Sequence, residues 1–325
     1  MMGPAARSAA CRSLRSAPTA EMGDAGMRGR WFVARWVAAL VVGLLGVLAL
    51  ALPVGAAAPI SLVVTNALDN VNDANCMVVS CTLRQAVNAS NANDPGAGNH
   101  NTITFANGLT GPIMLTTASG GTLTLIHDVA IDGTGATIAV DGGHAVGVFV
   151  VNNGVTATIN ALTIQHGSSS NGGGIANSGS VTVTNSTFFA NSTNINGGLG
   201  GGILTNGSSA TVTNTLLAGN TASSGHGPDA FGAFISHGGN LIGIVDAQTS
   251  GFTQPTDQTG TPATPLNPLL GVLGAYGSAN GTQTLPLLPG SPAIDKGIAA
   301  GAPATDQRGK SRVGAPDIGA FESQG

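Results

Sequence analysis

Three aspartates in the middle of the chain are the side chains best suited to hydrolytic chemistry, because a glycoside hydrolase needs convergent carboxylates. Asp132 and Asp141 each directly precede a glycine, where aspartate is common for turn reasons. Asp128 follows His127 and opens an alternating apolar run. These positions make a carbohydrate-active enzyme, a polysaccharide hydrolase or lyase, the alternative function, and their spacing assigns no acid and base roles.

The other reactive side chains fit enzyme chemistry poorly. A lyase that acts on an acidic sugar needs a cationic residue, frequently beside Ca²⁺. No lysine or arginine occurs between Arg84 and Lys296, and Tyr276 is the only tyrosine. The six histidines lack metal-ligand spacing, so we predict no metal site and no cofactor. The histidines are His100, His127, His144, His166, His226 and His237.

The N-terminal region has the features of an export signal when it is read from Met27. Residues 37–52 form an uncharged apolar run, which is marginal in length for spanning a bilayer. Small residues follow at 56–58, and we place cleavage after Ala57. We therefore expect residues 1–57 to be a signal region. Removal of this region should leave a chain that has no stable membrane span and is secreted or held at the cell surface. The alternative is that the apolar run is retained as an N-terminal anchor. The positive residues before the apolar run are Arg28, Arg30 and Arg35.

The chain after the predicted cleavage site is acidic. It keeps five basic residues against 13 acidic ones, a net charge of −8. Neutralising a phosphate backbone needs clustered lysine and arginine, so nucleic acid is not an expected partner. Both tryptophans leave with the signal region, which removes an aromatic platform for sugars. An unknown surface ligand or a glycan is the expected partner.

Two cysteines follow the predicted signal region, Cys76 and Cys81. In an exported protein an isolated pair predicts a disulfide bond. A metal site with Asp69 and Asp73 is the alternative, but two cysteines without a second pair or a nearby histidine fall short of a zinc pattern. Calcium at these aspartates and the neighbouring asparagines stays open, although no 12-residue calcium loop is present.

An internal repeat carries most of the information about the fold. Glycine runs at 172–174 and 200–202 each open into alternating apolar and polar residues that end on two asparagines. A weaker copy ends at Asn160, with His166 where its closing asparagine would fall. The leading asparagines are therefore 25 and then 29 residues apart, the length of one stacked unit. The paired asparagines of the two clear copies are Asn185 with Asn191 and Asn214 with Asn220.

Short strands of period two within such units predict an all-β, right-handed parallel β-helix. The asparagines of successive coils are expected either to hydrogen-bond in a ladder or to adopt left-handed turn conformations, and the sequence does not separate the two roles. The residues predicted to point into the core are Ile175, Val181, Val183, Ile203, Val212 and Leu216.

The segment around the cysteines begins a short helix. Thr82 and Gln85 form a capping box, and Leu83, Ala86 and Val87 fall on one helical face. The run CTLRQA at 81–86, preceded by an Asp-x-x-Cys at 73–76, resembles the CSLREA domain, with Thr82 and Gln85 replacing the usual serine and glutamate. The resemblance implies an exported protein with a β-helical body, and no enzymatic activity comes with it.

The C-terminal region concentrates the remaining charges. We interpret them as an ion-paired polar cap over the open end of the solenoid, in preference to a functional site. Its residues are Asp295, Asp306, Arg308, Arg312, Asp317 and Glu322.

The same region resembles the choice-of-anchor Q domain. The matching segments are GNLIG at 239–243, NPLL at 267–270, GSPAID at 290–295, DQRG at 306–309 and DIGAFE at 317–322. The segment QTLP at 283–286 lacks the histidine of the family's pattern. Members carry varied C-terminal sorting anchors, and the expectation for this chain is either free secretion or a truncated gene model.

These observations predict four regions: a signal region at 1–57, an N-terminal capping segment at 58–98, a parallel β-helix at 99–245 and a C-terminal region at 246–325. We expect an exported, non-catalytic protein for surface adhesion, scaffolding or interaction. Ice or mineral binding by a threonine-rich face is a weaker alternative, because the Thr-x-Thr pairs at 156/158 and 182/184 do not continue over many coils.

Overall fold

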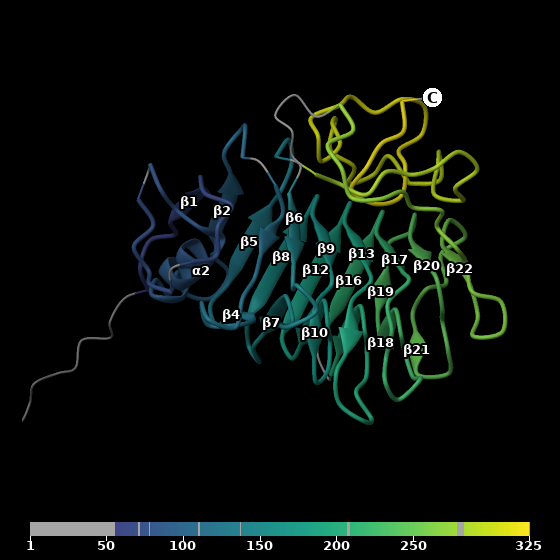
Figure 1. The fold of residues 1–325 in the computed structure, drawn as a ribbon, viewed down its shortest axis with the longest axis horizontal. Helices are drawn as coiled ribbons and strands as arrows, with labels where there is room; N and C mark the ends of the chain where they lie inside the picture. Colours follow the sequence, from purple (N-terminus) through teal and green to yellow (C-terminus); the bar gives the residue numbers. More distant parts are fainter. Residues whose placement is uncertain are drawn as a thin grey trace, which may run out of the picture. The chain divides into compact units, whose positions relative to one another are not determined.

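The computed structural model describes residues 56–324 except 71, 78, 110, 137, 207–208 and 278–282. Met27 and nearly all of the predicted signal region lie outside the described residues. Figure 1 shows the described chain as a stack of short strands with the C-terminal segment beside it.

Three long sheets form the body, and all strand pairs within them are parallel. Sheet 1 contains β1 (Ser61–Val64), β2 (Asn101–Phe105), β5 (Val129–Asp132), β8 (Thr156–Asn160), β12 (Ser180–Thr184), β16 (Ala210–Thr213) and β19 (Ile235–Ser236). Sheet 2 contains β3 (Ile113–Met114), β6 (Ala139–Asp141), β9 (Thr163–Gln165), β13 (Thr187–Phe189), β17 (Leu216–Ala218), β20 (Leu241–Ile242) and β22 (Gln258–Thr259). Sheet 3 contains β4 (Leu123–Leu125), β7 (Phe149–Val151), β11 (Ile175–Asn177), β15 (Ile203–Thr205), β18 (Ala230–Ala233) and β21 (Thr249–Ser250).

The chain visits sheets 1, 2 and 3 in turn and then returns to sheet 1 one strand further along, which confirms the right-handed parallel β-helix. A small sheet of β10 (Ser168–Ser169) and β14 (Ser192–Thr193) lies at one corner. Because β1 pairs with β2 and β22 pairs with β20, the solenoid extends beyond the predicted range 99–245 at both ends. The GNLIG segment at 239–243, which contains β20, is followed by the further sheet 2 strand β22.

The core fills the space between the three sheets. Val183 pairs with Ile159 on one side and Val212 on the other, and all three side chains are fully buried. Ile175 and Ile203 are equivalent residues of sheet 3. Five of the six residues predicted to point inward therefore do so: Ile175, Val181, Val183, Ile203 and Val212.

Leu216 is the exception. It pairs with Thr187 on the outward-facing side of β17, while its neighbour Leu217 pairs with Phe188 inside the solenoid. Leu216 is still fully buried, because it packs in a second apolar cluster with Ile318 and other residues of the C-terminal region. The prediction that Leu216 lies in the solenoid core was wrong. The residues that bury its side chain belong to a segment about a hundred residues further along the chain.

In the weak copy of the repeat, the left-handed corner position falls one residue later than the sequence indicates, so the coil that follows is one residue shorter. Asn160 pairs with Thr184, so Ala161, rather than Asn160, takes the left-handed position that Asn185 occupies in the next coil. Gln165 pairs with Phe189. His166 therefore lies at the left-handed corner position next to Ala190, and not where a closing asparagine would stand.

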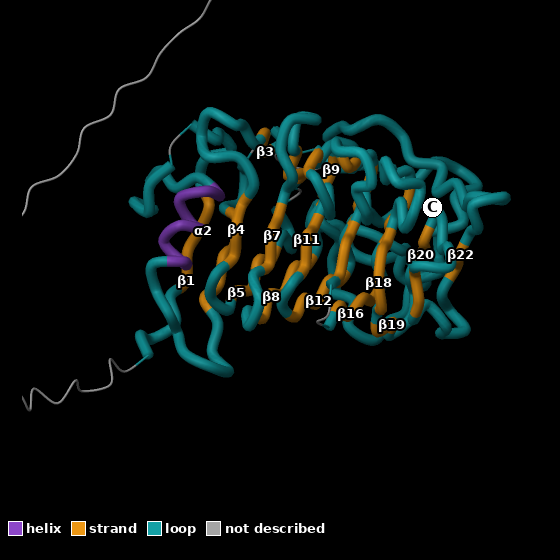
Figure 2. The backbone as a smooth tube through the Cα atoms, turned by 90° about the horizontal axis from the view of Figure 1, so that it is seen from below, coloured by secondary structure: helices purple, strands orange, loops and turns teal. Residues whose placement is uncertain are grey.

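One helix occurs in the described residues, α2 (Leu83–Asn91), and it lies at the β1 end of the stack (Figure 2). Both bonds of the predicted capping box between Thr82 and Gln85 are present. Leu83, Ala86 and Val87 are buried against the core, as the helical pattern predicted. The helix closes the N-terminal end of the solenoid.

The C-terminal region lies along the side of the solenoid, over the outer face of sheet 2 (Figure 1). Gln307 donates to the carbonyl of Ile138 and accepts from Thr163 on β9. Ala320 N–H donates to Thr187 Oγ1 on β13. The prediction that this region covers the open end of the solenoid was therefore wrong; it screens a lateral face whose outward side chains include Leu216.

Candidate functional site

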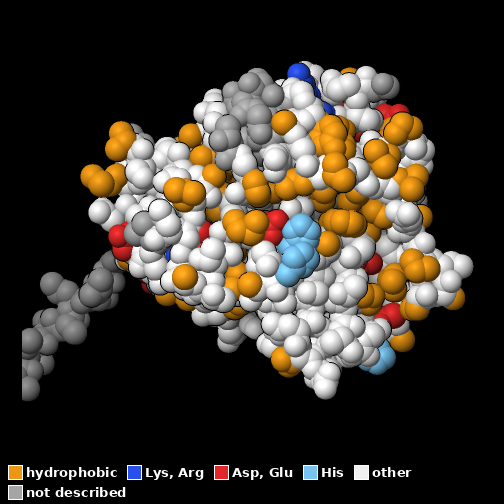
Figure 3. Space-filling model, in the orientation of Figure 1, with side chains coloured by type: hydrophobic (Ala, Val, Ile, Leu, Met, Phe, Trp, Pro, Cys, Tyr) orange, Lys and Arg blue, Asp and Glu red, His pale blue; other side chains and the backbone are white. Residues whose placement is uncertain are grey.

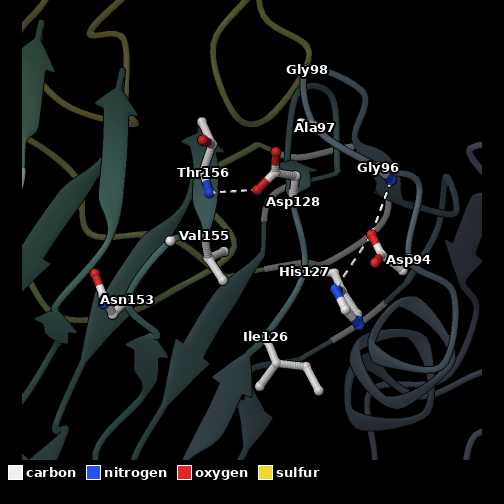
Figure 4. A pocket seen from close by; sticks show the side chains of 11 residues that line it. Asp94, Gly96, Ala97, Gly98, Ile126, His127, Asp128, Asn153, Val155 and Thr156 are labelled. Carbon is white, nitrogen blue, oxygen red and sulfur yellow. Dashed lines mark hydrogen bonds and ion pairs between the residues drawn. The ribbon is translucent and has the colours of Figure 1, made fainter. Parts of the chain in front are cut away.

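The outer face of sheet 1 carries a groove. At one end a hollow of about 420 Å³ lies between the loop at 94–98 and the turns before β5 and β8. Asp128 Oδ1 accepts a hydrogen bond from Thr156 N at 2.7 Å, and His127 Nδ1 lies 3.6 Å from Asp94 Oδ1 (Figure 4). Both aspartates and the histidine are reached by solvent.

Two further hollows continue this one along the strands. A smaller hollow of about 130 Å³ shares Gly98, Asp128 and Thr156 with it and adds Thr158. A third hollow, of about 440 Å³, also contains Thr158 and reaches the loop at 301–303. Its other side chains come from β5, β8 and β12: Asp132, Asn160 and Thr184.

Threonine covers more of this face than the sequence indicated. The register aligns Thr158 with Thr182, so the two Thr-x-Thr pairs are offset by two residues and do not stack as pairs. One outward column across sheet 1 is instead Thr102, Ala130, Thr158, Thr182 and Thr211. The neighbouring column is Thr104, Asp132, Asn160, Thr184 and Thr213.

The three candidate catalytic aspartates are not brought together. Asp128 and Asp132 lie four residues apart along one strand, which separates their Cα atoms by roughly 13 Å. Asp132 accepts bonds from Thr134 and from Asn160 Nδ2, at the far end of the strand from Asp128. Asp141 belongs to sheet 2. The hydrogen bonds of the first two carboxylates hold them against different residues of the next coil, Thr156 and Asn160, so they do not form the close acid and base pair of a glycosidase.

Asp141 instead belongs to a compact polar cluster at a corner of the solenoid. Its carboxylate is 4% exposed and its Oδ2 lies 2.9 Å from His166 Nδ1 and 2.7 Å from Gln165 Nε2. The rings of His166 and His144 lie in tilted contact, with centroids 4.3 Å apart and an interplanar angle of 39°. Sequence spacing missed this cluster, because its histidines come from successive coils.

The cysteine segment is held by bonds within the fold. Cys76 and Cys81 lie at disulfide distance, with Cα atoms 4.4 Å apart. Asp69 pairs with Arg84, whose Nε lies 2.6 Å from Oδ1, and both side chains are almost fully buried. Asp73 accepts from Gln85 Nε2, and this bond, followed by one from the Asn75 N–H, lowers the pKa of Asp73. Both carboxylate oxygens of Asp69 and Oδ1 of Asp73 thus accept hydrogen bonds from protein donors.

The asparagine positions combine both roles that the sequence left open. Asn185 and Asn214 have φ of 48°, in the left-handed region, and Asn214 Nδ2 donates to Asn185 Oδ1 at 3.4 Å. Asn191 and Asn220 form a second ladder inside the coil, where Asn191 Nδ2 donates to Asn220 Oδ1 at 2.9 Å. Neither of these two is among the residues with positive φ.

Asp229 ends this second ladder, and the sequence pattern did not reveal it. Its Oδ1 accepts from Asn220 N and Nδ2, and its Oδ2 accepts from Ile244 N. Burial raises the pKa of Asp229 to about 7, although these hydrogen bonds act in the opposite direction. The only signal in the sequence was an aspartate after Gly-Pro, which is typical of a turn.

The C-terminal charges form a buried network. Arg308 Nε lies 2.7 Å from Asp306 Oδ2, and Arg312 Nη1 lies 2.8 Å from Glu322 Oε2. The guanidinium carbon of Arg308 also lies 3.7 Å from the centre of the Phe321 ring. Asp317 accepts from the backbone N–H of Asp295, whose own side chain is exposed. Burial raises the pKa of Asp317, and the nearby charge of Glu322 adds to this effect.

No family model, curated protein or solved structure matches the chain. Among residues 56–324 outside the gaps given above, no group of three or more histidine, cysteine or acidic side chains is arranged to hold a metal ion. Over the same residues, no helix combines the length and the apolar character needed to cross a membrane.

Proposed function

We propose that the protein is an exported, non-catalytic β-helix that serves as an adhesion, scaffold or interaction protein at the cell surface or in the medium. One observation carries the proposal: the three aspartates that could have formed a hydrolytic centre lie apart, Asp128 and Asp132 at opposite ends of one sheet 1 segment and Asp141 on sheet 2. Asp132, Asp141 and the C-terminal carboxylates each accept hydrogen bonds from neighbouring coils or turns.

Export is supported by the N-terminal pattern and by the cysteine pair at disulfide distance, because disulfides persist in oxidising compartments. The likeness to the CSLREA and choice-of-anchor Q domains supports the same compartment. We expect the chain to begin at Met27 and to be cleaved after Ala57.

A stack of parallel coils suits a display function. Each coil is bonded to the next along three sheets, so the outer faces are held at a fixed spacing of about 4.8 Å per strand. The face shown in Figure 3 carries few charged atoms. A surface of hydroxyl and amide groups recognises ligands through hydrogen bonds rather than through long-range attraction.

Cell fractionation with N-terminal sequencing tests the export part of the proposal. The expected result is protein in the medium or at the cell surface that begins near Ala58. Full-length protein in the cytoplasm that retains residues 1–26 would contradict it.

A further inference from the structure

We propose that the groove on the outer face of sheet 1 binds an extended, neutral glycan chain. The inference rests on the proposed function and gives that function a ligand class and a place on the molecule. We call this surface the sheet 1 groove, and it is defined by Gly98, Asp128, Thr156, Thr158, Asp132 and Asn160.

The shape of the groove favours a chain over a compact ligand. Each hollow shares at least one lining residue with the next, so the three lie in a row from the loop at 94–98 to the loop at 301–303. Asp128 directly precedes β5 and Asp132 ends it, so their Cα atoms lie roughly 13 Å apart. A ligand that contacts both must therefore extend along the strand.

The polar groups of the groove match hydroxyl-rich ligands. An ionised carboxylate only accepts hydrogen bonds, a threonine hydroxyl donates and accepts, and an asparagine amide does both. Asp128 is fixed by the Thr156 N–H, and its second oxygen points toward the loop at 96–98 (Figure 4). Asp132 is fixed by Thr134 and Asn160. Groups that are already oriented lose little freedom on binding.

The charge of the groove selects against acidic ligands. It contains the carboxylates of Asp94, Asp128 and Asp132, and the chain has no lysine or arginine between Arg84 and Lys296. A uronate or sulfated sugar would bring its own negative charge next to these aspartates, which is unfavourable at short range. Neutral sugars satisfy the same acceptors without this cost.

Aromatic stacking makes no contribution in this groove, because none of its side chains is a tryptophan, tyrosine or phenylalanine. Hydrogen bonds spread over several sugar units must supply the affinity. We therefore expect affinity to rise with chain length, with a hexasaccharide binding at least tenfold more tightly than the disaccharide of the same sugar.

Calorimetric titration of the exported chain tests the inference. The probes are the hexasaccharides of cellulose, xylan, mannan and chitin as neutral chains, and hexagalacturonate as the acidic one. At least one neutral hexasaccharide should bind, and the double variant Asp128→Asn/Asp132→Asn should weaken that binding at least tenfold. Both asparagines keep one acceptor oxygen for the fold. Asp295→Asn is the matched control, because its exposed side chain lies in the C-terminal region and asparagine tolerates its positive φ.

Three outcomes would overturn the inference: no neutral hexasaccharide binds, the double variant binds as tightly as the parent at an unchanged thermal midpoint, or hexagalacturonate binds more tightly than every neutral chain. The same samples are analysed for shortened sugars. Cleavage would contradict the proposed function, whereas absence of both binding and cleavage would contradict only the glycan inference.

Discussion

The side-chain amide of Asn214 is bonded twice to the backbone of Ile298, 84 residues further along the chain. Asn214 Nδ2 donates to the Ile298 carbonyl at 2.8 Å, and the Ile298 N–H donates to Asn214 Oδ1 at 2.7 Å. The backbone carbonyl of Asn214 also accepts from Gly319 N–H. One ladder asparagine therefore fixes the C-terminal region to the side of the solenoid.

We predict that Asn214→Gly lowers the free energy of unfolding by about 1–3 kcal/mol, because glycine keeps the positive φ but loses both bonds to Ile298. Asn214→Ala should cost about 1 kcal/mol more, because alanine is strained in the left-handed region. Urea denaturation measures both. An Asn214→Gly variant as stable as the parent would show that position 214 matters only for its left-handed backbone conformation, and that the bonds to Ile298 do not stabilise the fold.

Val183 tests the register of the solenoid. We predict that Val183→Asp costs about 3 kcal/mol or more, because the side chain is fully buried among apolar neighbours and the new charge has no partner there. Thr182→Asp is the control, since Thr182 points outward on the same strand. Equal melting temperatures for the two variants would contradict the register.

The repeat made the architecture predictable, because the buried positions of each coil are apolar in period two. Ile175 and Val183 could be placed from this alternation alone. Leu216 and Thr187 are equivalent in register and both are buried under the C-terminal region, Leu216 in the cluster with Ile318 and Thr187 through its bond to Ala320 N–H. No local pattern reports a contact between segments so far apart in the chain.

The sheet 1 groove was equally hidden. Asp128 and Asp132 were recognised as candidate carboxylates, but Asp132 before a glycine also fitted a turn, and Asp128 was placed at the start of an alternating apolar run. The hollow forms because loops at 94–98 and 301–303 flank one sheet face, and these loops are some two hundred residues apart. The buried role of Asp229 was missed for a different reason: an aspartate after Gly-Pro is typical of a turn, although its partners Asn220 and Ile244 are near in sequence.

Asp229 should make stability depend on pH. Its pKa is about 7 in the folded chain and about 3.9 in an unfolded one, so only the folded state keeps the proton between these values. The free energy of unfolding should therefore fall as the pH rises from about 4 to about 7, by up to about 4 kcal/mol. Denaturation across this range should show a smaller slope for Asp229→Asn.

The exposed Asp295→Asn variant is the control and should keep the slope of the parent. If Asp229→Asn and the parent lose stability equally between pH 4 and pH 7, the carboxyl group of Asp229 is ionised over this whole range. Burial would then not raise its pKa.

Cys76 and Cys81 are predicted to be joined in the exported protein. Mass spectrometry of unreduced peptides should show the linked pair lighter than the reduced form by two hydrogens. The double variant Cys76→Ser/Cys81→Ser should lower the free energy of unfolding by about 2 kcal/mol. This is the entropic stabilisation expected from closing so short a loop in the unfolded chain. Free thiols in the exported protein, or zinc retained after dialysis, would contradict the bond.

The most direct test of the non-catalytic account is incubation of the exported chain with neutral and acidic polysaccharides, with and without Ca²⁺. We predict no new reducing ends and no unsaturated products, because Asp128, Asp132 and Asp141 do not converge and no lysine or arginine occurs between Arg84 and Lys296. Product that forms with the parent and is lost with Asp128→Asn, Asp132→Asn or Asp141→Asn would contradict the account and identify a hydrolase.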